Sequence, residues 1–475
     1  MTVSCQTAAQ LRFILVVTFV AALGGLLFGY DTAVISGAIQ FLTAHFRLDA
    51  AQTGWAASCA LAGCIAGCAL AGWIGDSLGR RIVLVISAVL FLVSAIGTAV
   101  SFSYAEFIAF RLLGGIGIGA ASIASPIYIA EMAPHRWRGW LVGTNQLAIV
   151  SGMLMIYFVN YRIVHLGGDA WNQNVGWRWM FASGALPAAV LLVLLLPLPE
   201  TPRFLISKGR RSEAAEVAGK IGDEIDAFAE ITTLDNEAHS EERLSLFAHP
   251  LRHVILLGIG LAVLQQITGI NVFLYYAPEI FRSFGNGLST AMAETVVIGA
   301  VNLVFTIIAM ITVDRLGRKP LLIIGSLGMC LSLTATGTAL LRQTNSAWLL
   351  AAVIFYIACF ALSLGPVTWI VLSEIFPLKI RSRCVAIASV ALWAANFAVS
   401  QTFPMMTSSA WLLRQLHNSF PFFVYAGFCV VEVVFVWKLI PETKGRSLEE
   451  IAQSWTGRRA DDRPAHIIPA SGAER

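Results

Sequence analysis

The chain carries the segment Gly75-Asp76-Ser77-Leu78-Gly79-Arg80-Arg81, and a similar segment returns as Val313-Asp314-Arg315-Leu316-Gly317-Arg318-Lys319. Two further signals repeat in the same order. Glu131 with Arg138-Gly139 returns as Glu374 with Arg381-Ser382, and Pro199-Glu200-Thr201 returns as Pro441-Glu442-Thr443. Three repeats in one order indicate that a single unit has been duplicated along the chain.

The residues around these repeats have the composition of a membrane protein. Hydrophobic residues make up 57% of the 475 residues and charged residues 13%, whereas charged residues alone reach about 25% in soluble domains. A membrane-spanning helix needs about 20 mainly apolar residues, and long apolar runs also exclude a β-barrel. We predict twelve spanning helices, at residues 11–37, 53–74, 81–101, 105–130, 139–162, 178–198, 252–284, 290–313, 320–341, 346–376, 382–408 and 418–440.

The order of these spans predicts an all-α membrane protein with two pseudo-symmetric six-helix bundles. We expect the first bundle over residues 1–198, a cytoplasmic linker with short amphipathic helices over 199–251, the second bundle over 252–440 and a cytoplasmic tail over 441–475. Repeated halves of this kind are typical of transporters, which bind their substrate near the membrane midplane between the halves.

Lys and Arg residues cluster in the turns after the second, fourth, eighth and tenth spans, and the opposite turns are poorer in them. Because cytoplasmic loops carry the excess of basic residues, we expect both termini to be cytoplasmic. This topology accounts for the net charge of +4 without a nucleic-acid partner. All of the eight cysteines except Cys5 lie within or beside spans, so we expect neither a disulfide framework nor a metal site.

Asp31 and Arg111 are ionisable residues that lie inside apolar spans. A charge at mid-membrane costs about 2.5 to 3.5 kcal/mol on insertion scales, so such residues usually face the bundle interior and belong to an ion or substrate path. One acid and one base suggest a pair in which the carboxylate exchanges its proton as the guanidinium approaches or withdraws. The alternative is a static ion pair that joins two helices.

Amide side chains occupy the middle of the seventh span. Gln265 and Gln266 can share one face of a helix, but Asn271 points elsewhere if the helix stays regular. A glycine between them, Gly269, is where a membrane helix can break. We therefore predict a discontinuity near Gly269 that brings Asn271 and Tyr275 to the same cavity. The alternative is that these amides only form hydrogen bonds between helices.

Neutral amides and aromatic faces together suit a sugar, because hydroxyl groups need donors and acceptors and Asn or Gln offers both. Trp369 and Trp393 lie well inside the tenth and eleventh spans. A lone tryptophan in a membrane protein is more often an interfacial anchor, but the depth of these two favours cavity positions. Gly365-Pro366 is expected to weaken the tenth helix and let it bend.

The chain resembles the major facilitator superfamily, whose signature is the D-x-L-G-R-[RK] turn found here after the second and eighth spans. Further motifs narrow the resemblance to the sugar porter family: Pro199-Glu200-Thr201-Pro202-Arg203, Gln265-Gln266-Ile267-Thr268-Gly269-Ile270-Asn271 and Pro441-Glu442-Thr443-Lys444-Gly445. The resemblance covers residues 10–455. Residues 23–37 look most like the bacterial D-xylose:proton symporters.

The resemblance implies a set of sugar ligands, and every position keeps the expected residue type: Phe28, Gln146, Gln265, Gln266, Asn271, Tyr275, Asn302, Gly365, Trp369 and Trp393. Two positions depart from the xylose porters. Met153 and Leu392 stand where those porters carry Gln, and hexose transporters of the family are also apolar at the first of the two. Glucose or a related hexose therefore competes with xylose as the expected substrate.

The resemblance also implies that Asp31 carries the coupling proton and that Arg111 is its partner. It implies a cytoplasmic network whose pairs hold the cytoplasmic ends together in one state and break in the other: Asp76, Arg80, Arg81, Glu131, Arg138, Glu200, Arg203, Asp314, Arg315, Arg318, Glu374, Arg381 and Glu442. The alternative is that these charges only anchor the topology.

These observations predict a proton-coupled symporter of a monosaccharide, a monomer in the bacterial cytoplasmic membrane with protons as coupling ion and no cofactor. A passive facilitator of the same fold is the alternative, although passive members of the family typically carry a neutral residue at the position of Asp31. A sugar sensor without transport is a further alternative. No Ser-His-Asp set, P-loop or metal cluster appears in the sequence, so we do not expect an enzyme.

Overall fold

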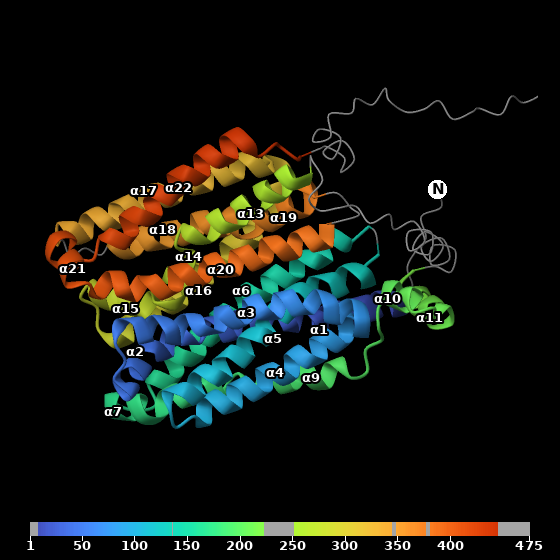
Figure 1. Cartoon of the computed structure of the whole chain (residues 1–475), viewed down its shortest axis with the longest axis horizontal. Helices are drawn as coiled ribbons and strands as arrows, with labels where there is room; N and C mark the ends of the chain where they lie inside the picture. Colours follow the sequence, from blue (N-terminus) through green and yellow to red (C-terminus); the bar gives the residue numbers. More distant parts are fainter. Residues whose placement is uncertain (1–7, 135, 223–250, 344–347, 377–380, 445–475) are drawn as a thin grey trace, which may run out of the picture.

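The computed structural model describes residues 8–134, 136–222, 251–343, 348–376 and 381–444. Within these ranges the regular structure is helical, and twelve helices or helix pairs are long and apolar enough to cross a membrane. The predicted number of spans is therefore confirmed. Figure 1 shows two groups of helices side by side, the N-terminal group in blue to green and the C-terminal group in yellow to red.

The N-terminal half contains six spans, of which the first and the sixth are interrupted. The first is built from α1 (Ala8–Ala33) and α2 (Ile35–Phe46), and the sixth from α7 (Asp169–Trp171), a π-helical turn (Asn172–Gly176), α8 (Trp177–Ala182) and α9 (Ala185–Leu195). The four between them are continuous: α3 (Ala50–Leu78), α4 (Arg80–Val100), α5 (Tyr104–Met132) and α6 (Arg138–Val164).

The C-terminal half also contains six spans, of which the first and the fourth are interrupted. Its first span consists of α13 (Leu251–Ile267), α14 (Ile270–Tyr275) and α15 (Ala277–Ser283), and its fourth of α18 (Trp348–Leu362) and α19 (Leu364–Ile375). The other spans are α16 (Leu288–Leu316), α17 (Arg318–Leu341), α20 (Arg381–Ser408) and α22 (Phe420–Leu439), and a short helix α21 (Ala410–Leu416) precedes the last.

The repeated turns have the same backbone conformation in both halves. Gly79 has φ +107° where α3 meets α4, and Gly317 has φ +88° where α16 meets α17. L-residues rarely adopt positive φ, so the glycine of each D-x-L-G-R segment permits the sharp reversal between two spans. The start of α3 is fixed differently, by a reciprocal capping box between Asp49 and Gln52.

The described part of the linker contains two short helices, α10 (Pro202–Ser207) and α11 (Arg211–Ile221). Helix α11 buries Ala214, Val217, Ala218 and Ile221, a spacing that forms one apolar face, and it packs against α1. Figure 1 places both helices at one end of the bundle. The rest of the predicted linker, residues 223–250, and the predicted tail from residue 445 lie outside the described residues.

The two halves meet along α3 with α20 and along α6 with α16. The hydrogen bonds that join the two halves lie between the helix interruptions and the end of the molecule that holds α2 and α15 (Figure 1). They join Ser58 and Ala51 to Gln401, Gln40 to Arg282, His165 to Ser289, and Tyr157 to the carbonyl of Leu274. In the described part of the chain, hydrogen bonds thus hold the halves together at the end away from α10 and α11.

Candidate functional site

The charged pair inside the N-terminal half is formed by Asp31 on α1 and Arg111 on α5. Arg111 Nη1 donates to Asp31 Oδ1 at 2.9 Å, and Nη2 donates to the Asp31 backbone carbonyl at 3.1 Å. Arg111 is 1% exposed, and its guanidinium lies 5.3 Å from the centre of the Phe181 ring. Asp31 Oδ2 is buried without a hydrogen-bond partner. One carboxylate oxygen is therefore held by Arg111, while the other has no protein partner.

Asp31 also lies directly before the interruption of the first span. Helix α1 ends at Ala33 and α2 begins at Ile35. The carbonyls exposed by this break are bound by side chains: Asn160 Nδ2 donates to Val34 O at 3.2 Å, and Arg111 binds the carbonyl of Asp31. The guanidinium therefore holds both the carboxylate and the end of α1.

The predicted discontinuity of the seventh span is present at Gly269. Helix α13 ends at Ile267, Gly269 has φ +94°, and α14 begins at Ile270. Because the chain changes direction here, Asn271 Nδ2 reaches Gln266 Oε1 at 2.5 Å. The break thus brings Asn271 and Gln266 together, which a regular helix would prevent.

The amides continue as a chain to the tenth span. Gln266 Nε2 donates to Gln265 Oε1 at 3.1 Å, and Gln265 Nε2 donates to the carbonyls of Leu364 and Gly365 at 2.7 and 3.3 Å. Those carbonyls belong to α19, which is separated from α18 by Ser363. The predicted weakness beside Gly365-Pro366 is thus an interruption of the helix. Gln265 also makes the hydrogen bond between helices that the alternative hypothesis required.

Aromatic side chains from both halves also meet each other. Phe28 on α1 and Trp393 on α20 have ring centroids 5.3 Å apart, and Trp393 is 3% exposed with a buried Nε1 that has no hydrogen-bond partner. Trp369 is partly buried on α19. Phe28 lies one turn before Asp31, so a single helix presents residues to both predicted sites.

A second connection between the halves runs through Tyr275, which is buried on α14. Its hydroxyl lies close to Thr32 on α1, and Asn396 Nδ2 donates to it at 3.5 Å. Thr32 and Asn396 were not among the predicted site residues. Each follows a predicted residue on the same helix, Asp31 or Trp393, and that proximity was the available signal.

Two predicted ligands, Gln146 on α6 and Asn302 on α16, lie on helices that pack against each other across the halves. Gln146 is partly buried and Asn302 is 4% exposed. Within the described chain neither amide has a protein hydrogen-bond partner, so both are available to a ligand hydroxyl. Met153 on α6 and Leu392 on α20 are buried and add no polar group.

The network near α10 repeats almost atom for atom in the two halves. In the N-terminal half, Arg80 lies 3.2 Å from Asp76 and 3.4 Å from Glu131, whose other oxygen accepts from Thr201 Oγ1 at 2.6 Å. Glu200 accepts hydrogen bonds from the backbone N–H groups of Arg80, Arg81 and Thr201. Glu200 therefore caps the N-terminus of α4.

In the C-terminal half, Arg318 lies 2.9 Å from both Asp314 and Glu374, and Thr443 Oγ1 donates to Glu374 Oε2 at 2.5 Å. Glu442 accepts from the backbone N–H groups of Arg318 and Lys319 at 3.1 Å. It therefore caps α17 as Glu200 caps α4, because carboxylates are stabilised at helix N-termini.

The environments of the two capping carboxylates differ. Burial raises the pKa of Glu200 above its ordinary value, although backbone N–H groups oppose the shift. At Glu442 burial acts in the same direction, but hydrogen bonds from four backbone N–H groups outweigh it, and the pKa lies below its ordinary value. Glu442 is therefore the more firmly ionised of the two carboxylates.

Some predicted members of the network occupy other positions. Arg81 does not bind a carboxylate with its side chain, which donates to the carbonyls of Leu195 and Leu196 at the end of α9. The side chains of Arg203 and Arg315 are exposed, and Arg138 begins α6. Arg381 begins α20, but its side chain lies outside the described residues. The ion pairs described here join helices within one half, whereas a clamp between the cytoplasmic ends of both halves would need pairs across them.

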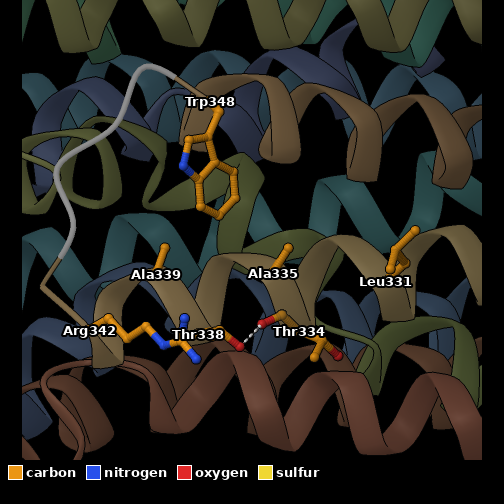
Figure 2. A pocket seen from close by; sticks show the side chains of 7 residues that line it. All are labelled: Leu331, Thr334, Ala335, Thr338, Ala339, Arg342 and Trp348. Carbon is orange, nitrogen blue, oxygen red and sulfur yellow. Dashed lines mark hydrogen bonds between the residues drawn. The ribbon is translucent and has the colours of Figure 1, made fainter.

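A groove on the outer face of α17 lies apart from these sites. It is lined by Leu331, Thr334, Ala335, Thr338, Ala339, Arg342 and Trp348. Figure 2 shows the Thr338 hydroxyl bonded to the carbonyl of Thr334 rather than directed at the groove. None of the predicted substrate ligands contributes to this groove.

Comparison with known proteins identifies the family to which the chain is similar. The family model "Sugar (and other) transporter" matches residues 17–455. The D-xylose-proton symporter of Escherichia coli (strain K12) is 44% identical over 95% of this chain and 97% of its own length. The glucose facilitated diffusion protein of Zymomonas mobilis is 38% identical over 93% of this chain and 97% of its own length.

Solved structures agree in fold. The major facilitator superfamily proton:xylose symporter XylE bound to 6-bromo-6-deoxy-D-glucose superimposes with a TM-score of 0.82 and 42% identity, over 94% of this chain and 100% of that one.

Proposed function

Because the chain belongs to the sugar transporter family of the major facilitator superfamily, we propose that it imports a monosaccharide together with a proton. The protein is a multi-pass membrane sugar transporter that works by alternating access. The finer proposal is symport of a D-xylose-type or D-glucose-type sugar driven by the inward proton gradient.

The observation that carries the proton coupling is the Asp31–Arg111 pair with one free carboxylate oxygen. Protonation of Asp31 removes the charge that holds Arg111, and Arg111 also binds the end of α1 beside the break. The same helix carries Phe28 and Thr32, which contact Trp393 and Tyr275 of the other half. A proton on Asp31 can therefore change how α1 meets the sugar site without touching the sugar.

The proposed sugar site lies between the halves and consists of amides and rings. We assign the ten ligands predicted by resemblance, from Phe28 to Trp393, to this site. The amide chain of Asn271, Gln266 and Gln265 satisfies itself in the structure, and sugar hydroxyls can replace those bonds because amides both donate and accept. Met153 and Leu392 leave one side of the proposed site apolar, where the xylose porters carry Gln. This difference favours a hexose as the substrate.

The proposed setting is a bacterial cytoplasmic membrane with both termini cytoplasmic and the protein acting as a monomer. The geometry that the two networks share then lies on the cytoplasmic side. Exposed ion pairs are worth about 0 to 1 kcal/mol each. We assign Asp76, Arg80, Glu131, Asp314, Arg318 and Glu374 the role of biasing a nearly balanced equilibrium between two states.

Passive facilitation of the same sugars is the second candidate. It is favoured by the similarity to the glucose facilitated diffusion protein of Zymomonas mobilis, which is 38% identical to this chain. A facilitator needs no titrating group, so the Asp31–Arg111 pair would then be a static ion pair between α1 and α5.

Uptake of labelled xylose and labelled glucose into proteoliposomes separates these functions. Symport predicts that an inward proton gradient concentrates one of the sugars above its outside level, whereas facilitation predicts equal levels with or without the gradient. Uptake of neither sugar would contradict both functions for these substrates.

A further inference from the structure

The last span of the C-terminal half carries a carboxyl group that the mechanism above does not use. Glu432 lies in the middle of α22 and is 0% exposed. Neither Oε1 nor Oε2 has a hydrogen-bond partner, and no ion pair involves Glu432 in the described part of the chain. Burying an ionised carboxylate in such a place costs several kcal/mol. Carboxyl groups inside membrane spans are therefore rare, and those that are present usually have a function.

The groups that face Glu432 are polar but uncharged. On its own helix these are Tyr425 and Cys429, and they share its buried face by their spacing. From α17 comes Ser326, the side chain next to the carboxyl group, and from α18 comes Tyr356. Cys330 on α17 lies behind Cys429. No basic group therefore compensates an ionised Glu432 from the described faces of these helices.

Two of the hydroxyl groups near Glu432 already donate to backbone carbonyls. Ser326 Oγ donates its proton to the carbonyl of Leu322 at 2.8 Å, and Tyr356 donates its proton to the carbonyl of Thr268 at 3.0 Å. Each of these two hydroxyls can therefore offer Glu432 only a lone pair. A carboxylic acid can donate to a lone pair, whereas a carboxylate cannot.

The same tyrosines connect Glu432 to the break of the seventh span. Thr268, whose carbonyl binds Tyr356, directly precedes Gly269. The Tyr425 ring packs so closely on Gly269 that a Cβ added there would lie 2.6 Å from a ring carbon. The other side chains of the break, Gln266 and Asn271, form the proposed sugar site. Glu432 thus belongs to a cluster with Tyr356 and Tyr425, and these tyrosines contact the break at Gly269, which we call the hinge.

We propose that Glu432 is a second proton-binding site of this transporter, separate from Asp31, and that the hinge at Gly269 keeps its packing only while Glu432 holds its proton. At alkaline pH the carboxylic acid releases a proton to water, and the remaining carboxylate disrupts the contacts of Tyr356 and Tyr425. The inference rests on sugar movement through the proposed site but not on coupling through Asp31.

Sugar counterflow tests this proposal without any proton gradient. Proteoliposomes with equal pH on both sides exchange labelled for unlabelled glucose or xylose, and the rate is measured as the pH is raised stepwise. The wild-type rate is expected to fall about tenfold at alkaline pH, corresponding to about 1.4 kcal/mol, while Glu432→Gln keeps its neutral-pH rate. Glu294→Gln, a partly buried glutamate on α16 away from the hinge, is expected to follow the wild type.

An unchanged alkaline decline in Glu432→Gln would overturn the proposal, and so would a wild-type rate that does not depend on pH. Because neither outcome depends on uphill accumulation, the symport proposal can fail separately. If Glu432→Gln does not fold, Glu432→Met replaces it. Infrared spectroscopy of the wild type should then show a buried carboxylic acid band that is missing in Glu432→Met, and its presence in both proteins would reject the assignment.

Discussion

Asp31 uses its two oxygens differently, since Oδ1 accepts from Arg111 and Oδ2 has no partner. Asparagine can keep the first interaction but cannot take up a proton. We therefore expect Asp31→Asn to lose uphill accumulation driven by a pH gradient and to retain sugar counterflow. Both are measured with labelled sugar in proteoliposomes. Asp49→Asn, at the exposed start of α3, serves as the control, and accumulation that persisted in Asp31→Asn would refute the coupling role.

Gln266 lies at the centre of the amide chain, because it accepts from Asn271 and donates to Gln265. Replacing it with leucine leaves Asn271 Nδ2 and Gln265 Oε1 without these hydrogen bonds, which costs about 1 to 3 kcal/mol. We expect Gln266→Leu to weaken sugar binding about 5-fold to 150-fold, as measured by calorimetry with glucose and xylose. Gln415→Leu, exposed on α21, should bind as the wild type does. Equal affinities in all three proteins would exclude Gln266 from the site.

The sequence located the residues that are chemically unusual but not all of their partners. Asp31 and Arg111 stood out because charge is rare in an apolar span, and the structure pairs them. Thr32 and Asn396 carry small polar groups that are common in membrane helices, so only the fold shows that they meet at Tyr275. Glu432 carries the same signal, a carboxyl group inside the predicted span 418–440, but it was not among the predicted site residues.

Interrupted helices are the elements that bring the site together. The seventh span breaks at Gly269 and the tenth at Ser363, and α1 passes into α2 at Val34, whose own backbone stays helical. Each break lies beside a residue of the proposed mechanism: Asp31, Asn271 or Gly365. Backbone carbonyls at these breaks accept hydrogen bonds from the Arg111, Asn160 and Gln265 side chains.

Gly269 tests the role of the break in the seventh span. Its φ of +94° is costly for any residue with a Cβ, and such an atom would lie 2.6 Å from the Tyr425 ring. We expect Gly269→Ala to lower the free energy of unfolding by about 1 to 2 kcal/mol or more and to slow counterflow, measured by thermal unfolding in detergent and by exchange rate. Gly287→Ala is the matched control, because nothing lies within 4 Å of its added Cβ. If the two variants behaved alike, the break would not limit transport.

The number and order of these elements could be predicted from apolar length, but their ends could not. The first span was expected to end at residue 37, yet α2 continues to Phe46, because polar residues such as Gln40 and Thr43 are bound by neighbouring groups. The break at Gly269 was predicted since glycine and misplaced amides coincide there. The break at Val34 has no glycine or proline to indicate it.

The whole molecule combines two halves with similar internal networks and an asymmetric contact between them. Arg80 with Glu131 and Arg318 with Glu374 tie helices within each half, so each half can move as a rigid body. The duplication of charged residues was readable from the sequence. The sequence could not show that each ion pair joins helices of the same half, because the same acids and bases could also pair across the two halves.

Hydrogen bonds between the halves lie at the end of α2 and α15, and Gln401 on α20 contributes two of them. Ser58 Oγ donates to Gln401 Oε1 at 2.8 Å, and Gln401 Nε2 donates to the carbonyl of Ala51 at 2.9 Å. Gln401→Leu removes both, and each is worth about 0.5 to 1.5 kcal/mol. In an equilibrium between two states, this loss favours the state that is open at this end, about 5-fold to 150-fold.

Distances between spin labels on α3 and α20 at this end report that equilibrium. We expect the longer distance to gain population in Gln401→Leu and to remain at the wild-type level in Gln415→Leu. Phe28 and Thr32 of one half meet Trp393 and Tyr275 of the other, so the sugar is expected to bind best when both halves contact it. Added sugar should therefore reverse part of the gain in the longer distance. A distance distribution that neither the substitution nor the sugar alters would mean that Gln401 does not control opening, and that the apolar packing of α3 on α20 holds this end closed.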